Sequence, residues 1–338
     1  MKVEAPTKVT LNQLQKGVDF ETLDAAFGPE SLGILVVEGL SDEFHQLRND
    51  VLRQLSELAR LPNDELSKLE NEESMWLTGW SCGKEKLADG RLDTYKGSFY
   101  VNCAFHKDAQ LEGPPQEIVD QFKDHKMYTT PNVWPSKELD GLKDFEANCK
   151  KLCNLIIDVA ALVASSCDSY IKANGGYSMK DNYLKLIVEN STTTKARFLH
   201  YYPPPVAESQ DEVWCGEHLD HSCITGLTSA MYLKEYEGVE VPIELSPDPN
   251  AGLYIRSRHG EVVKVNIPPT CLAFQTGSAL QEISRGKFKA VPHYVQASKA
   301  QNVSRNTLAV FCQPDLSDMV NDEENFAEYS TRIVGGNH

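Results

Sequence analysis

The sequence predicts a mixed α and β fold in which N-terminal helices pack outside an all-β core. Two long segments before residue 182 repeat apolar residues at helical spacing, which is typical of helices that bury one face. After Tyr183 the chain changes to short β-rich runs that turn residues separate, with no helical pattern between them. Strands at this spacing favour a sandwich or a jelly-roll barrel, and such a barrel can hold a ligand in its mouth.

The first half supplies the helices. Leu32–Leu40 is predicted to be a short buried strand, after which Ser41 caps a helix that extends to Ala59. Acidic residues in the first turn of that helix suit the positive end of its dipole. The segment "TYKGSFYVNC" alternates like a strand, and a proline-rich connector then leads to a second long helix from about Leu142 to Ala173.

The β-rich runs continue to Pro314. An extra segment around "YEGVEVPIELSPDPN" is predicted to form a surface hairpin or a lid. Neither a repeat nor a flexible linker is visible, so we expect one domain over residues 1–338. It comprises a mainly helical region with short strands (1–182), a jelly-roll core (183–314) and an acidic C-terminal segment (315–338) that forms a helix or tail outside the barrel.

Composition limits the classes of partner. The chain has 33 basic and 49 acidic residues, a formal net charge of -16, which argues against nucleic acid or an anionic membrane as its main partner. Nine cysteines show no regular framework, so free thiols in a reducing compartment are expected. The N-terminus lacks the apolar stretch of a signal peptide, and "LCNLIIDVAALVASSC" is too short to span a bilayer. We expect a soluble, cytoplasmic monomer with a small-molecule substrate.

One short stretch, "GEHLDHSCITGL", carries candidate metal ligands. His218 and Asp220 lie two residues apart, so on a strand their side chains point to the same face. His293, in "KFKAVPHYV" near the end of the β half, completes a set of two imidazoles and one carboxylate. This set leaves three coordination positions free, which suits non-haem Fe(II) that must bind a co-substrate and dioxygen together. Zinc is the rival metal, although zinc hydrolases usually keep one open position.

A candidate anion site follows in "SRNTLAVF". Arg305 and Thr307 are two apart on a strand, and a guanidinium with a hydroxyl can hold a carboxylate by charge-assisted hydrogen bonds. Upstream, "ARFLHYYPPP" places Phe198, His200 and Tyr202 on one face, which makes Tyr202 a third donor.

The segments "LHYYPPP", "HLDHSCITGL", "SRGKFKAVPHYV" and "SRNTLAVF" together resemble the iron(II)- and 2-oxoglutarate-dependent dioxygenases of the isopenicillin N synthase-like branch. The likeness runs from about residue 30 to residue 315 and implies a double-stranded β-helix (jelly-roll) core. It also implies Fe(II), 2-oxoglutarate as co-substrate and dioxygen. By position, the implied metal ligands are His218, Asp220 and His293, and the implied 2-oxoglutarate contacts are Arg305, Thr307 and Tyr202.

The chain departs from the pattern of that family at three positions. Thr307 stands where Ser is common, which keeps the hydroxyl. Tyr294 follows the second histidine in place of a frequent Arg, and His200 replaces a frequent Asn, so the co-substrate contacts are less certain than the metal ligands. Thr225 matches a family position and is interpreted as barrel packing.

Substrate contacts are predicted from strand parity and from the strand "TYKGSFYVNC", which could close over the mouth. The candidate residues are Phe198, His200, Trp214, Lys96, Tyr100 and Asn102. The resemblance implies oxidation of an unactivated C–H bond in a small molecule of specialised metabolism, by hydroxylation, desaturation or ring closure, with release of succinate and CO2. Three alternatives stay open: an iron oxidase of the same branch that does not use 2-oxoglutarate, a protein or nucleic-acid hydroxylase, and a catalytically silent ligand-binding barrel.

Overall fold

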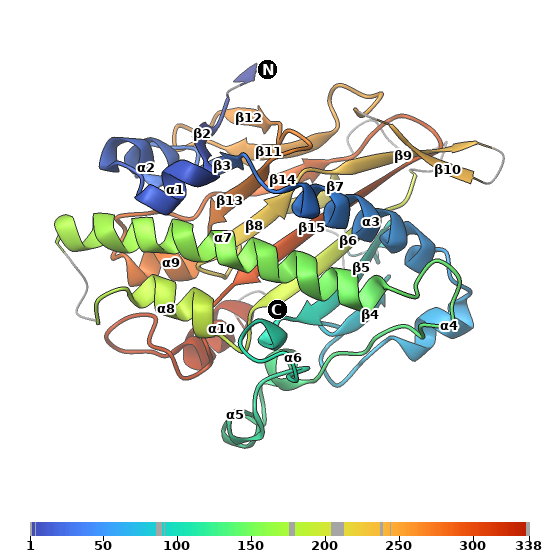
Figure 1. Cartoon of the computed structure of the whole chain (residues 1–338), viewed down its shortest axis with the longest axis horizontal. Coiled ribbons are helices and arrows are strands. Elements are labelled where there is room, and N and C mark those ends of the chain that lie inside the picture. The colour runs from blue at the N-terminus through green and yellow to red at the C-terminus, as the bar shows by residue number, and fades with distance from the viewer. Residues whose placement is uncertain are drawn as a thin grey trace.

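Two β-sheets face each other in the centre of the molecule, and helices cover the outer face of the larger one (Figure 1). The structure is a computed structural model and describes residues 2–3, 5–85, 90, 92–175, 180–203, 213–236, 239–243 and 245–335. This arrangement confirms the prediction of a mixed α and β fold with helices outside a β core. The jelly-roll is built mainly from the second half of the chain.

The larger sheet mixes strands from both halves of the chain. In spatial order it contains β2 (Thr7–Thr10), β3 (Ile34–Glu38), β13 (Leu272–Thr276), β8 (Ile224–Thr228), β15 (Val303–Cys312), β6 (Lys195–Tyr201), β5 (Lys96–Asn102) and β4 (Gly79–Cys82). β9 (Met231–Tyr236) also pairs with β15, and β10 (Val239–Ile243) pairs with β9 as a hairpin. The described residues of the extra segment predicted as a hairpin or lid supply β10 and the turn after it, and Glu237, Gly238 and Glu244 lie outside the described residues.

The smaller sheet closes the barrel opposite the larger one. Its spatial order is β1 (Lys2–Val3), β12 (Val262–Val265), β11 (Gly252–Arg256), β14 (His293–Gln296) and β7 (Val213–His218). β14 and β7 are antiparallel, and their register sets His293 directly opposite His218. Two histidines that are far apart in sequence are thus brought to the same edge of the barrel.

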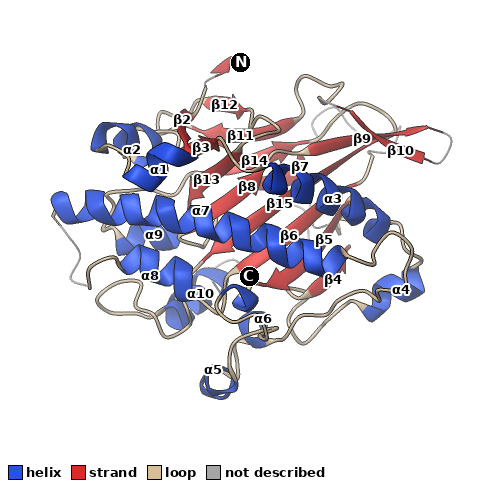
Figure 2. Ribbon diagram, in the orientation of Figure 1, coloured by secondary structure: helices blue, strands red, loops and turns tan. Residues whose placement is uncertain are grey.

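The helices lie mostly on one side of the sheets (Figure 2). They are α1 (Leu11–Lys16), α2 (Phe20–Phe27), α3 (Asp42–Ala59), α4 (Asn63–Lys68), α5 (Gln116–Gln121), α6 (Lys126–Thr129), α7 (Phe145–Ala173), α8 (Tyr183–Asn190), α9 (Ser278–Ile283) and α10 (Phe326–Gly335). α3 begins after Ser41, whose side chain accepts a hydrogen bond from the Phe44 backbone N–H, as predicted. α7 begins three residues later than predicted, because the chain first makes a turn in which the Phe145 N–H donates to the Leu142 carbonyl oxygen at 3.0 Å.

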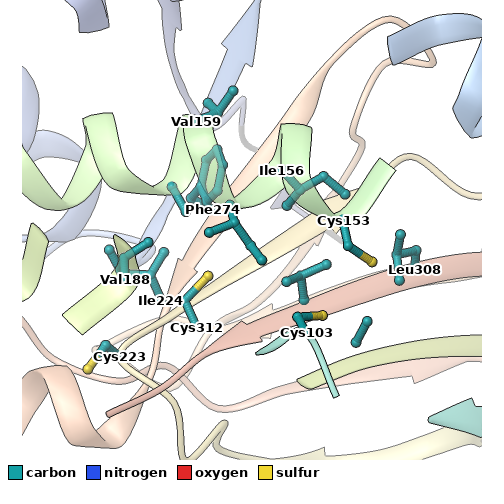
Figure 3. Close-up of a cluster of buried hydrophobic side chains, with 14 of the residues drawn as sticks. Cys103, Cys153, Ile156, Val159, Val188, Cys223, Ile224, Phe274, Leu308 and Cys312 are labelled. Carbon is teal, nitrogen blue, oxygen red and sulfur yellow. The ribbon is translucent and has the colours of Figure 1, made fainter. Parts of the chain in front are cut away.

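The main core lies between α7 and the outer face of the larger sheet (Figure 3). Cys153 and Ile156 of α7 meet Leu308 and Cys312 of β15 there. The contact is close at Gly226 of β8, where an added Cβ would lie 2.5 Å from Cγ2 of Ile156. Glycine at this point lets the helix rest directly on the sheet.

Two findings differ from the sequence predictions. α9 and α8 lie within the segment expected to lack helices, and both are too short for a clear helical period. α7 is long and apolar enough to cross a membrane by length and composition, and 67% of its most apolar window is buried inside the structure. That degree of burial is typical of a helix that belongs to a protein core.

Candidate active site

A cavity of about 240 Å³ lies between the two sheets. The larger sheet contributes polar and apolar residues to it from alternate positions of β6 and β15, and the smaller sheet contributes both histidines of the predicted triad. Among the lining residues are Arg197, Leu199, Tyr201, Cys215, His218, Asp220, Leu227, Leu253, His293, Arg305, Thr307, Ala309 and Phe311. Leu245, 75% exposed, lies at the mouth after the β9–β10 hairpin.

The predicted metal ligands meet at one point of this cavity. One ligand atom from each of His218, Asp220 and His293 lies within 4.8 Å of the other two. Oδ1 of Asp220 is 3.6 Å from Nε2 of His218 and 3.7 Å from Nε2 of His293. These separations are longer than hydrogen bonds and fit three groups that share one cation.

Both imidazoles are held in the tautomer that a metal requires. Nδ1 of His218 is 2.8 Å from the Gly216 carbonyl oxygen, and Nδ1 of His293 is 3.1 Å from that of Val291. A carbonyl oxygen only accepts, so each Nδ1 donates its proton and each Nε2 is left as the ligand atom. Metal-bound histidines are usually oriented in this way.

The carboxylate ligand is oriented by a hydroxyl that the sequence interpretation assigned to packing. Thr225 donates a hydrogen bond of 2.7 Å from Oγ1 to Oδ2 of Asp220, and Thr225 itself lies 2.9 Å from the Ser222 hydroxyl. Oδ2 is thereby held away, while Oδ1 faces the two imidazoles. Thr225 thus positions the carboxylate, and the sequence signals for this were its match to a family position and its place five residues after Asp220.

The two histidines differ in their environment. Burial lowers the pKa of His293, which favours the neutral imidazole that can bind a metal. Burial also lowers the pKa of His218, but the Cys215 thiol and the charge of Asp220 outweigh burial and raise that pKa to about 9. A cation at the triad would displace the proton from His218.

Arg305 presents an unsatisfied guanidinium to the same cavity. It is 6% exposed, and its Nε and Nη1 atoms are buried without a hydrogen-bond partner in the described part of the chain. Its guanidinium lies over the Tyr201 ring at 5.1 Å from the centroid. Thr307 lines the cavity two residues away. A buried guanidinium with open N–H groups is costly unless a ligand satisfies it, so this wall fits a carboxylate.

The parity predicted for β6 is wrong. Tyr202 does not line the cavity, because its hydroxyl donates to the Ala59 carbonyl oxygen at 2.9 Å on the other side of the strand. Phe198 is buried in the main core, and His200 lies 2.7 Å from Oδ1 of Asn306 with its pKa lowered by burial to about 4. The neighbouring residue, Tyr201, faces the cavity instead.

The other predicted substrate contacts do not reach the cavity either. Lys96 pairs with Glu85 and Asp93, and the Tyr100 ring stacks on the guanidinium of Arg197. Neither side chain lines the cavity. Asn102 is occupied at the far end of β5, where its amide donates to the Tyr128 carbonyl oxygen. Trp214 is buried against Tyr201, with ring centroids 5.2 Å apart.

A double-stranded β-helix that carries two histidines and one carboxylate beside an open cavity defines the class of non-haem iron oxygenases. The comparisons agree with this class. Residues 193–314 match the 2OG-Fe(II) oxygenase superfamily, and this part of the chain is therefore a domain of that superfamily. The matched residues include the triad, Arg305 and Thr307.

Two curated relatives from Arabidopsis thaliana are similar to part of the chain. Its 1-aminocyclopropane-1-carboxylate oxidase 5 is 23% identical over 205 residues, which are 61% of this chain and 56% of the relative. Its gibberellin 2-beta-dioxygenase 1 is 25% identical over 150 residues, which are 43% of this chain and 40% of the relative. The matched region thus spans only about half of each curated relative.

Among solved structures, full-length Neurospora crassa T7H in complex with alpha-KG (2-oxoglutarate) has a similar fold. The TM-score is 0.68 at 17% identity, and the match covers 98% of this chain and 96% of that protein. The likeness therefore extends over both sheets and the covering helices, and it supports the double-stranded β-helix fold predicted from the sequence.

Proposed function

We propose that this protein is an Fe(II)- and 2-oxoglutarate-dependent dioxygenase that oxidises an unactivated C–H bond of a small molecule of specialised metabolism. The observation that carries the proposal is the shared cavity of a metal-ligand triad and a buried guanidinium with two unpartnered nitrogens. We place the protein in the cytoplasm as a monomer, and its nine unpaired cysteines favour a reducing compartment.

Each part of the site has a distinct task in this proposal. His218, Asp220 and His293 would hold the iron, which, when bound with 2-oxoglutarate, supplies the oxidising chemistry and yields succinate and CO2. Arg305 and Thr307 would bind the distal carboxylate of the co-substrate, with Tyr201 in the place that we predicted for Tyr202. The cavity is small compared with ligand pockets of about 300–1,000 Å³, which favours a compact substrate.

The chain's own residues decide how the substrate meets the oxidising centre. The apolar walls exclude water and align the substrate, and small errors in alignment cost rate steeply. Whether hydroxylation, desaturation or ring closure follows depends on that alignment. One relative is named as an oxidase and another as a dioxygenase, so the main rival is an iron oxidase whose arginine binds the substrate's own carboxylate.

One experiment tests the proposal and separates it from the rivals. The protein is loaded with Fe(II) under anaerobic conditions and titrated with 2-oxoglutarate, and succinate is then measured after admission of air with a metabolite library. We expect about one iron per chain, a new absorption band on addition of 2-oxoglutarate, and succinate release. Iron binding with substrate loss but no succinate would favour the oxidase, and failure to bind iron would favour a silent binding barrel.

A further inference from the structure

A second arginine reaches the cavity from the same wall as Arg305. Arg197 lies on β6 opposite Ala309 of β15, whereas Arg305 lies opposite Tyr201. The two arginines are thus four residues apart along the paired strands, or about 13 Å at a rise of roughly 3.3 Å per residue. This spacing leaves room for two ligands side by side on one wall.

Arg197 is held in place from behind. Its Nε donates to the Ser98 hydroxyl at 3.0 Å, its Nη2 donates to the Glu85 carboxylate, and its guanidinium stacks on the Tyr100 ring at 5.0 Å from the centroid. Its side chain is 15% exposed. Among the described residues Nη1, the remaining guanidinium nitrogen, donates no hydrogen bond. The arrangement therefore fixes the group and leaves one nitrogen available to the cavity.

The charges around Arg197 are already balanced. Lys96 lies 2.9 Å from Glu85 and 3.0 Å from Asp93, so two cations face two carboxylates. A ligand on Nη1 therefore needs to bring an acceptor oxygen and need not bring a full charge. A ligand that displaces water without supplying such an oxygen would leave this N–H group unsatisfied and would bind more weakly.

The surfaces beside Arg197 are apolar. Leu199 and Ala309 flank it on the larger sheet, and Leu227 and Phe311 complete this part of the lining. Resting on the proposed function, we infer that Arg197 is a substrate-binding residue. The substrate is a small, largely apolar molecule with one acceptor oxygen, a carboxylate or a neutral carbonyl, that binds at Nη1 of Arg197. Arg305 remains the co-substrate residue.

The test uses matched probes on the full chain loaded with Mn(II) and 2-oxoglutarate, which binds without turnover. Indole-3-acetate, indole-3-acetamide and 3-methylindole, and likewise phenylacetate, phenylacetamide and toluene, are compared by thermal shift. We expect the acids or the amides to raise the melting temperature more than the hydrocarbons. If only the acids raise the melting temperature, the substrate needs a carboxylate. If the acids and the amides both raise it, a neutral carbonyl is sufficient.

Variants then locate the effect. Arg197→Met should weaken binding of the acceptor-bearing probes by roughly tenfold or more, since a hydrogen bond to a charged group contributes about 1.5–3 kcal/mol. Glu85→Gln combined with Arg197→Met removes both members of this ion pair and so keeps the net charge of the parent if the single variant folds poorly. Arg53→Met, at an exposed position of α3, is the matched control.

Binding of 2-oxoglutarate separates this inference from the proposed function. Arg197→Met should leave the affinity for 2-oxoglutarate within about twofold of the parent, whereas a tenfold loss would make Arg197 a co-substrate residue and overturn the inference. The inference is also overturned if the acids and amides raise the melting temperature of the parent no more than the hydrocarbons do, which includes the case in which no probe binds. It is likewise overturned if the Arg197 variants bind the acids and amides as well as the parent does. Failure of the parent protein to bind 2-oxoglutarate would instead overturn the proposed function.

Discussion

The two faces of strands β6 and β15 do different work, although adjacent residues supply them. The outer face carries Phe198 and Leu308, which are fully buried beneath the helices. The inner face carries Arg305 and Thr307, which border the cavity. Two residues that are neighbours on one of these strands therefore point to opposite faces, so that one stabilises the fold and the other can contact a ligand. Substitutions on the two faces should separate these properties.

The largest effect is expected where the inner face meets the metal. Asp220→Ala should reduce iron binding and succinate formation to background, because it removes the only carboxylate of the triad and leaves two imidazoles. The melting temperature of the metal-free protein should change little. Iron content after anaerobic loading is the measurement, with Glu38→Ala, at the exposed last residue of β3, as the control. Retention of one tightly bound iron would remove Asp220 from the site.

The outer face should respond in stability. Phe198→Ala should lower the free energy of unfolding by about 3–5 kcal/mol, because its ring is fully buried among Phe99 and Phe145. Leu199→Ala, one residue along and already beside a cavity, should cost less stability and change ligand binding instead. Urea unfolding of both variants measures the difference. Equal losses of stability would break the comparison of the two faces.

Arg305→Ala should weaken 2-oxoglutarate binding by about 2–5 kcal/mol, or roughly 30-fold or more, since it removes a buried charged hydrogen-bond donor. Titration of the Fe(II) protein with 2-oxoglutarate under anaerobic conditions gives the affinity, and Arg53→Ala on α3 serves as the exposed arginine control. An unchanged affinity would mean that the co-substrate does not use this guanidinium.

Thr225→Val should lower metal affinity by about 10- to 100-fold, because it removes the hydroxyl that holds Oδ2 of Asp220 while keeping the shape of the side chain. Competition with a metal indicator measures the affinity, and Thr225→Ser should restore most of it. A valine variant with the parent's affinity would show that Asp220 is oriented without this hydrogen bond.

The smallest effects concern the two adjacent tyrosines. Tyr202→Phe should lower the free energy of unfolding by about 1 kcal/mol without changing 2-oxoglutarate affinity, because its hydroxyl donates to Ala59 on α3. Tyr201→Phe should instead weaken 2-oxoglutarate binding and leave the free energy of unfolding nearly unchanged, because Tyr201 faces the cavity. Weaker 2-oxoglutarate binding in Tyr202→Phe but not in Tyr201→Phe would restore the sequence-based prediction for Tyr202.

The sequence was sufficient to predict that His218, Asp220 and His293 meet at one point and that Arg305 and Thr307 line one cavity wall, because these residues lie in short polar motifs. His218 and Asp220 share a face by their spacing, and the order of the motifs along the chain supplied His293. The face of β6 could not be chosen in this way. Nearly every residue from Lys195 to Tyr201 is buried, so the alternation that normally marks the inner face is absent.

Arg197 and Thr225 were missed for a related reason. Ser98, which orients Arg197, lies on the neighbouring strand β5, and pairing between distant segments sets that contact. Thr225 reaches Asp220 only five residues back, but the bend of the chain between β7 and β8 sets this contact. A single sequence carries no direct record of either arrangement. Short helices such as α9, with six residues, also lack enough turns to show a helical period.

The glycine contact beneath α7 has a consequence for how mutations act at a distance. Gly226 follows Thr225 directly, so a bulkier residue there, or a change in Ile156, would displace the strand segment that orients Asp220. A helix that contributes no candidate ligand therefore contacts the strand that orients the proposed metal site. We expect variation along its buried side to change the metal affinity of that site while His218, Asp220 and His293 stay the same.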